Sequence, residues 1–218
     1  MHELIRILFL VLLTSCAGNQ GRTPVLPIFG EIKVNPVIHN GKQSIDTVYH
    51  TIGPFAFLNQ FNDTVDDNTL KHKVFIISCF HSTFQTKTDT LLEVTLDSVH
   101  RILGNEPDFY IISQTIDPAF DTPDILRKYC ENKNITGKNR YYLTGQSADS
   151  IYRFLRYKYF LLAERDTTNM ENGGFIHSDK IVLIDRQQRI RGYYDGTDIK
   201  HVGQLINDAK TLLQGDTL

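Results

Sequence analysis

Short apolar runs recur along the chain and predict the strands of a sheet. Residues 74–78 form a β-branched and aromatic run that is apolar almost throughout, as expected of a strand buried on both faces. The segments 180–185 and 190–194 are joined by a tight turn and must therefore pair antiparallel. Further runs bounded by turn residues predict strands over 55–58, 109–115 and 141–144.

Between the strands, apolar residues recur every three or four positions, which predicts amphipathic helices. The longest helix is expected over 83–103, a second begins at Thr122-Pro123 and reaches about 133, and others are expected over 147–159 and near the C-terminus. Strands that alternate with helices predict an α/β sandwich of three layers, in which a mixed central sheet carries helices on both faces. The closing antiparallel hairpin and helix are typical of a thioredoxin-like domain.

The N-terminus carries a different pattern. Residues 7–13 are continuously apolar, but a membrane-spanning helix needs about 20 such residues, so the run suits a signal peptide. Leu13-Thr14-Ser15-Cys16 follows and resembles a bacterial lipobox, in which the cysteine is lipidated after cleavage. The alternative is a plain secretory signal with a chance cysteine. The lipobox predicts a protein of the bacterial cell envelope, anchored to a membrane by lipid, with its domain outside the cytoplasm.

These signals divide the chain into four parts. Residues 1–15 are interpreted as the signal peptide and 16–27 as the lipidated cysteine and a tether. Residues 28–51 form an N-terminal extension, predicted to be a β-hairpin that turns at Asn40-Gly41. Residues 52–218 form the folded domain.

Composition narrows the function. The net charge is -2, and no basic cluster suggests binding to nucleic acid. Of the three cysteines, Cys79 and Cys130 belong to the folded domain. Cys130 lies far along the second helix, too distant for a bridge to Cys79, and is expected to be a buried thiol.

Cys79 is the first candidate for chemistry. It follows the buried strand and precedes a predicted helix, a position that lowers the pKa of a thiol and favours a thiolate. The alternative is an inert cysteine of the core. His177 lies in the loop that enters the strand from 180, which a thioredoxin-like sheet places beside Cys79. Thiolate and imidazole together suit copper or zinc, whereas the alternative for His177 is a surface histidine.

Four segments, in order and with matching separations, resemble the Sco/SenC family of copper chaperones for cytochrome c oxidase assembly. They are 74–79, which leads to Cys79; 113–123, which contains Asp-Pro-x-x-Asp-Thr-Pro; 142–145, which contains Leu-Thr-Gly; and 175–196, which contains His177 and the last hairpin. The resemblance implies a thioredoxin-like fold, copper held by Cys79 and His177, and an oxidase subunit or another envelope copper protein as partner.

The chain departs from the family at one decisive position. The family has a second cysteine four residues after the first, and here that position is Thr83. A hydroxyl forms no disulfide and is a poor ligand for Cu(I). We therefore expect no dithiol redox activity, no enzyme of that kind, and copper binding weaker than in relatives with two cysteines. Two ligands suit Cu(I) better than Cu(II).

Two further residues have alternative roles. His81 supplies an extra nitrogen to the site or, as the sequence favours, is a solvated side chain in the first helical turn. Asp121 caps the helix that begins at Thr122-Pro123, as favoured, or tunes the copper site.

Three functions remain at this stage. The first is a Sco-like accessory protein in copper handling. The second is a thioredoxin-fold protein with one reactive thiol. The third is a binding module that kept the fold and lost the metal chemistry.

Overall fold

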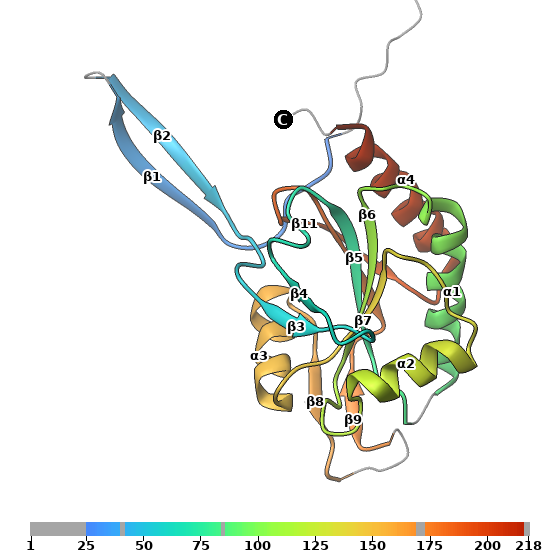
Figure 1. Cartoon of the computed structure of the whole chain (residues 1–218). Helices are drawn as coiled ribbons and strands as arrows, with labels where there is room; N and C mark the ends of the chain where they lie inside the picture. The colour runs from blue at the N-terminus through green and yellow to red at the C-terminus, as the bar shows by residue number, and fades with distance from the viewer. Residues whose placement is uncertain (1–24, 40–41, 84–85, 169–172, 216–218) are drawn as a thin grey trace, which may run out of the picture.

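A computed structural model describes residues 25–39, 42–83, 86–168 and 173–215 (Figure 1). Its centre is a five-stranded sheet with the strand order β11-β10-β5-β6-β7. Strands β5, β6 and β7 run parallel, whereas β10 is antiparallel to both β5 and β11. The strands are β5 (Val74–Phe80), β6 (Phe109–Thr115), β7 (Arg140–Leu143), β10 (Lys180–Ile184) and β11 (Ile190–Asp195). The predicted mixed sheet is confirmed.

Helices cover both faces of this sheet (Figure 1). Helices α1 (Lys87–Leu103) and α4 (Ile199–Gly215) pack on the face that carries Val74 and Ile76. Helix α3 (Ala148–Lys158) packs on the opposite face, which carries Ile77. Helix α2 (Pro123–Asn132) packs near the end of the sheet, on Phe80 and Tyr142. All positions of β5 are buried, as its apolar sequence predicts.

The start of α1 differs from the sequence prediction. Strand β5 continues to Phe80, and α1 begins only at Lys87, not near 83. The cause is a capping box, in which the hydroxyl of Thr86 accepts from the Asp89 amide and the Asp89 carboxylate accepts from the Thr86 amide. Cys79 therefore lies inside a strand, and residues 81–83 follow as a loop.

Two small hairpins add to the sheet. Strand β3 (Ala56–Leu58) pairs with β4 (Thr64–Asp66), and β8 (Ala163–Arg165) pairs with β9 (Phe175–His177). The strands β4, β8 and β9 were not predicted, because three-residue strands carry too little pattern. Strand β9 ends at His177, one of the candidate ligands.

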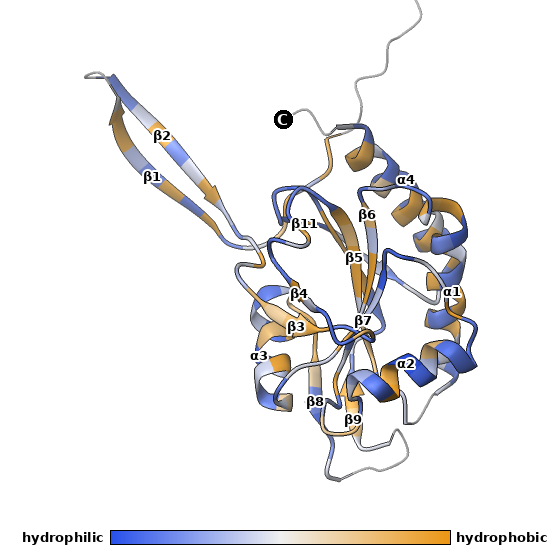
Figure 2. Ribbon diagram, in the orientation of Figure 1, coloured by the Kyte–Doolittle hydropathy of each residue, from blue (hydrophilic) through white to orange (hydrophobic). Residues whose placement is uncertain are grey.

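Strands β1 (Ile32–His39) and β2 (Lys42–Tyr49) form an antiparallel hairpin that projects from the body (Figure 1). Their register places Ile32, Val34, Ile38 and Ile45 on one face and mostly polar residues on the other. Ile38 and Ile45 are 73% and 72% exposed, and Figure 2 shows apolar positions along this arm. The hairpin thus leaves an apolar stripe in solvent.

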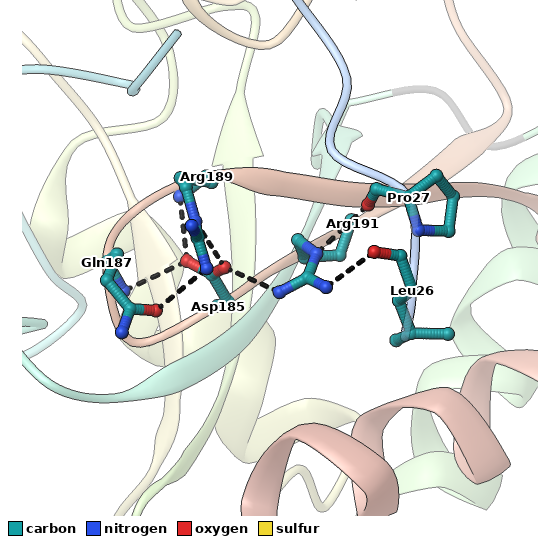
Figure 3. A network of polar contacts seen from close by, with 6 residues as sticks. All are labelled: Leu26, Pro27, Asp185, Gln187, Arg189 and Arg191. Carbon is teal, nitrogen blue, oxygen red and sulfur yellow. Dashed lines mark hydrogen bonds and ion pairs between the residues drawn. The ribbon is translucent and has the colours of Figure 1, made fainter. Parts of the chain in front are cut away.

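The chain that precedes the hairpin is fixed to the sheet by a buried arginine (Figure 3). Arg191 donates to the carbonyls of Leu26 and Pro27, with distances of 2.6 and 2.9 Å, and to the carboxylate of Asp185 at 2.8 Å. Asp185 also accepts from the side chain of Arg189 at 2.8 Å. These bonds satisfy charges that would otherwise be costly to bury.

The predicted signal peptide, Cys16 and most of the tether lie outside the described residues. Within the ranges that the structure describes, no helix is long and apolar enough to cross a membrane.

Candidate metal centre

Three side chains from separate elements meet at one end of the sheet. His81 comes from the loop after β5, Asp89 from the first turn of α1, and His177 from the end of β9. One ligand atom of each lies within 4.8 Å of the others, and His177 Nε2 is 3.2 Å from Asp89 Oδ1. Two imidazoles and a carboxylate form a ligand set for a transition-metal ion.

His177 is held in a fixed orientation. Its Nδ1 lies 3.2 Å from the carbonyl oxygen of Ser178 and donates to it, so that Nε2 faces Asp89. Burial alone would lower the pKa of His177, but the hydrogen bond and charge of Asp89 raise it above the ordinary value. The Asp89 carboxylate and the protonated form of the His177 ring thus stabilise each other.

Asp89 has two roles. Its Oδ2 accepts from the amide and hydroxyl of Thr86 at 2.8 and 2.7 Å, while Oδ1 faces His177. Burial would raise the pKa of Asp89, but the hydrogen bonds from His177 and Thr86 lower it to about 2. The cap of α1 thus holds a carboxylate in place at the site.

His81 is buried, and the prediction of a solvated side chain is wrong. The residue follows β5 directly instead of lying in a helical turn, and β9 covers it. Its ring packs against Phe175 and His177, with centroid distances of 5.4 and 5.6 Å. Burial, and then the charge of His177, lower the pKa of His81. Both effects favour the neutral ring.

Cys79 is buried as well, at 2% exposure. Burial raises the pKa of its thiol to about 12, against the opposing effect of a hydrogen bond from the Ser178 backbone. The predicted low pKa is wrong, because the residue lies within β5 and not at the start of a helix. The contact with Ser178 nevertheless places Cys79 beside the segment that carries His177.

The three-residue cluster is open to solvent on one side. A cleft of about 410 Å³ lies against His81, Asp89 and His177 and is also bordered by Thr88 and Asp179. An ion can therefore reach the cluster, and a water molecule can complete its coordination.

Comparison with known proteins now identifies the family. The SCO1/SenC family model matches residues 43–214, which is most of the chain. The protein belongs to the SCO1/SenC family. This family is associated with copper handling and cytochrome c oxidase assembly.

Solved structures of the family have the same thioredoxin-like fold. A SCO1/SenC family lipoprotein from Bacillus anthracis is 24% identical, with a TM-score of 0.67 over 75% of this chain and 95% of that one. BsSco, a Sco-family cytochrome c oxidase assembly protein with a disulfide switch, is 23% identical, with a TM-score of 0.65 over 76% and 95%. Copper-bound ScoI of Bradyrhizobium japonicum is 22% identical, with a TM-score of 0.58 over 73% and 98%.

Thr83 stands where the Sco/SenC pattern has its second cysteine. Its side chain is exposed, and its hydroxyl lies 3.4 Å from His81 Nδ1. The side chain at position 83 therefore contacts a histidine of the three-residue cluster.

Asp121 does not cap α2, because the hydroxyl of Thr122 accepts from the helix amide instead. The prediction of a cap is wrong by one residue. Asp121 is buried, and its carboxylate accepts from the hydroxyls of Ser82 and Thr115 and from the Ser82 amide. Burial raises the pKa of Asp121, although these bonds oppose the change. Asp121 thus ties the loop beside His81 to β6.

Cys130 is a buried free thiol in α2, packed with Leu126 and Tyr142, as predicted.

Asp89 is the residue that sequence analysis missed. Its only signal was the spacing of the Thr86–Asp89 capping box, which predicts a helix start and says nothing about a metal.

Proposed function

We propose that this SCO1/SenC protein is an envelope lipoprotein that handles copper during cytochrome c oxidase assembly. Cu(I) is the cargo, and Cys79 and His177 are its protein ligands. The observation that carries the proposal is the contact between the Cys79 thiol and the Ser178 backbone, one residue from His177. The copper-bound relative from Bradyrhizobium supports the choice of metal.

The donors suit this cargo. A thiolate is a soft ligand, and an imidazole nitrogen completes the low coordination that Cu(I) accepts. Binding requires that the buried thiol of Cys79 loses its proton to solvent, which costs free energy because its pKa is about 12. With one thiolate instead of two, we propose that copper is held more weakly than in relatives with both cysteines.

The lipid anchor on Cys16 completes the proposal. It would keep the domain at the membrane, where an oxidase subunit or another envelope copper protein is available as a partner. The SCO1/SenC family lipoprotein from Bacillus anthracis supports this arrangement.

A binding module without copper chemistry is the second candidate. The burial of Cys79 and the replacement of the second cysteine by Thr83 favour it. The same burial argues against a protein with one reactive thiol, because reactive cysteines are accessible and have a low pKa.

Competition between the full chain, purified in detergent, and a Cu(I) chelator tests the proposal. We expect Cys79→Ser to weaken Cu(I) binding by more than the roughly 10–100-fold that loss of an outer-shell partner costs. Cys130→Ser is the matched control, since it removes a second buried thiol outside the site. Equal Cu(I) affinity of the Cys79→Ser and Cys130→Ser proteins would show that the site is wrong and would favour the binding module.

A further inference from the structure

We infer that His81, Asp89 and His177 form a site for a divalent transition-metal ion of the Zn²⁺ or Cu²⁺ type. The site needs no thiolate and goes beyond the proposed function, which concerns Cu(I) on Cys79 and His177. Binding of Cu²⁺, the oxidised form of the copper cargo, at this site rests on the proposed function. The existence of the site does not depend on it.

The donor atoms have the right chemistry. Two imidazole nitrogens and one carboxylate oxygen match the three protein ligands of catalytic zinc sites and suit other borderline divalent ions. Cu(I), a softer ion, prefers sulfur. The sequence pattern alone indicates two ligands, Cys79 and His177. The fold brings Asp89 and the buried His81 close to His177.

The distances between the donor atoms are close to those between ligand atoms around a coordinated ion. Ligand atoms about 2.0–2.1 Å from a tetrahedral ion lie roughly 3.3–3.5 Å from one another. Here His177 Nε2 and Asp89 Oδ1 are already 3.2 Å apart, and the whole set lies within 4.8 Å. The donor atom of His81 lies within 4.8 Å of the other two, so it has to approach them for all three to hold one ion.

The supporting contacts orient the ligands as outer-shell partners do in metal proteins. Metal-bound histidines commonly donate their second ring nitrogen to a carbonyl or another oxygen. His177 Nδ1 donates to the Ser178 carbonyl at 3.2 Å, and His81 Nδ1 lies 3.4 Å from the Thr83 hydroxyl. With both Nδ1 atoms engaged, the Nε2 atoms are the ones that would bind an ion. At His177 the ion would replace the proton that Nε2 directs at Asp89.

The carboxylate is fixed from the opposite side. Thr86 binds Oδ2 of Asp89 through its amide and hydroxyl, which leaves Oδ1 for the ion. The cleft of about 410 Å³ gives access from solvent, and Asp179 on its border adds negative charge. An ion of charge +2 thus finds three oriented donors and room for a water ligand.

Calorimetric titration of the metal-free full chain with Zn²⁺ tests the site. We expect one Zn²⁺ per chain in the wild type and a loss of affinity of at least roughly 10–100-fold in Asp89→Asn and His81→Gln. Asparagine keeps the shape and hydrogen-bonding capacity of the cap, so Asp89→Asn is expected to fold, and circular dichroism checks this. The matched controls are Asp124→Asn, in the first turn of α2, and His201→Gln, which is exposed in α4; both should bind as the wild type does.

Electron paramagnetic resonance of the Cu²⁺-loaded protein gives a second readout. We expect nitrogen coupling from two imidazoles in the wild type and from one in His81→Gln. The proposal is overturned if the wild type binds neither ion, or if Asp89→Asn and His81→Gln bind Zn²⁺ as the controls do.

Cys79→Ser separates this inference from the proposed function. If both hold, that variant loses Cu(I) binding and keeps Zn²⁺ binding, whereas Asp89→Asn loses Zn²⁺ and keeps Cu(I). Loss of Zn²⁺ binding in a folded Cys79→Ser protein would contradict a site made of nitrogen and oxygen alone.

Discussion

The guanidinium of Arg191, with no exposed surface, donates a 2.6 Å hydrogen bond to the carbonyl of Leu26. This bond joins the segment at the beginning of the described chain to a strand near its end. A tether that leaves the domain here is therefore attached to the core of the sheet.

Replacing this arginine should destabilise the domain. Removing one partner of a buried ion pair commonly costs about 3–5 kcal/mol. We expect Arg191→Met to lower the free energy of unfolding by a value near the low end of this range, because Asp185 loses one partner but keeps Arg189. Urea denaturation measures the change. Arg127→Met is the control, since its ion pair with Asp124 is exposed and should contribute less than about 1 kcal/mol. Equal effects of the two substitutions would contradict the anchoring role.

A thiol at position 83 should strengthen copper binding. Thr83 contacts His81, so we expect the Thr83→Cys protein to retain Cu(I) against a chelator more tightly than the wild type. Ser82→Cys is the matched control, because the Ser82 side chain faces Asp121 instead. If neither variant gains affinity, this loop has diverged too far from the family geometry to hold copper.

The buried carboxylate of Asp121 should support both stability and metal binding. We expect Asp121→Ala to cost about 1–3 kcal/mol, because Ser82 and Thr115 lose their acceptor, and to weaken Zn²⁺ binding through the loosened His81 loop. Thermal unfolding and calorimetry measure the two effects. Asp149→Ala, at an exposed position in the first turn of α3, should cost less than about 1 kcal/mol and leave Zn²⁺ binding unchanged. Unchanged Zn²⁺ affinity in a folded Asp121→Ala protein would show that the loop does not depend on this bond.

The two thiols of the domain should be present but slow to react. Cys79 and Cys130 are free and buried, so alkylation in the native protein should be much slower than after denaturation. Mass spectrometry of the alkylated chain measures both rates. Rapid labelling of Cys79 in the native state would contradict its burial, and labelling only after reduction would indicate a disulfide.

Cys16 should carry the lipid. We expect incorporation of a labelled fatty acid by the wild type and none by Cys16→Ala, because the lipobox supplies the attachment point. Cys130→Ala is the control and should be labelled as the wild type is. Equal labelling of the Cys16→Ala protein would refute the anchor.

The sequence predicted the core of this fold well, for a physical reason. Helix α1 repeats apolar residues on one face, at Leu92, Leu96, Val99 and Leu103, and β5 is apolar throughout. Such patterns reflect burial directly, so the sheet and its helices could be derived from them.

The site was harder to predict, because it depends on where elements end. Strand β5 extends two positions beyond its predicted end at 78, so Cys79 lies buried within it, and burial raises the pKa of its thiol where a decrease was expected. His81 became buried for the same reason. The meeting of Asp89 with His177 depends on the short β8–β9 hairpin, which has almost no sequence pattern of its own.

The β1–β2 hairpin has a consequence for the energetics of the molecule. Among the described residues, these two strands pair only with each other, and a lone two-stranded hairpin is marginally stable in water. Its opening therefore need not unfold the five-stranded sheet, so amide hydrogens of the arm should exchange with solvent far faster than those of β5. The arm can therefore open and close while the end of the sheet that carries His81 and His177 keeps its structure.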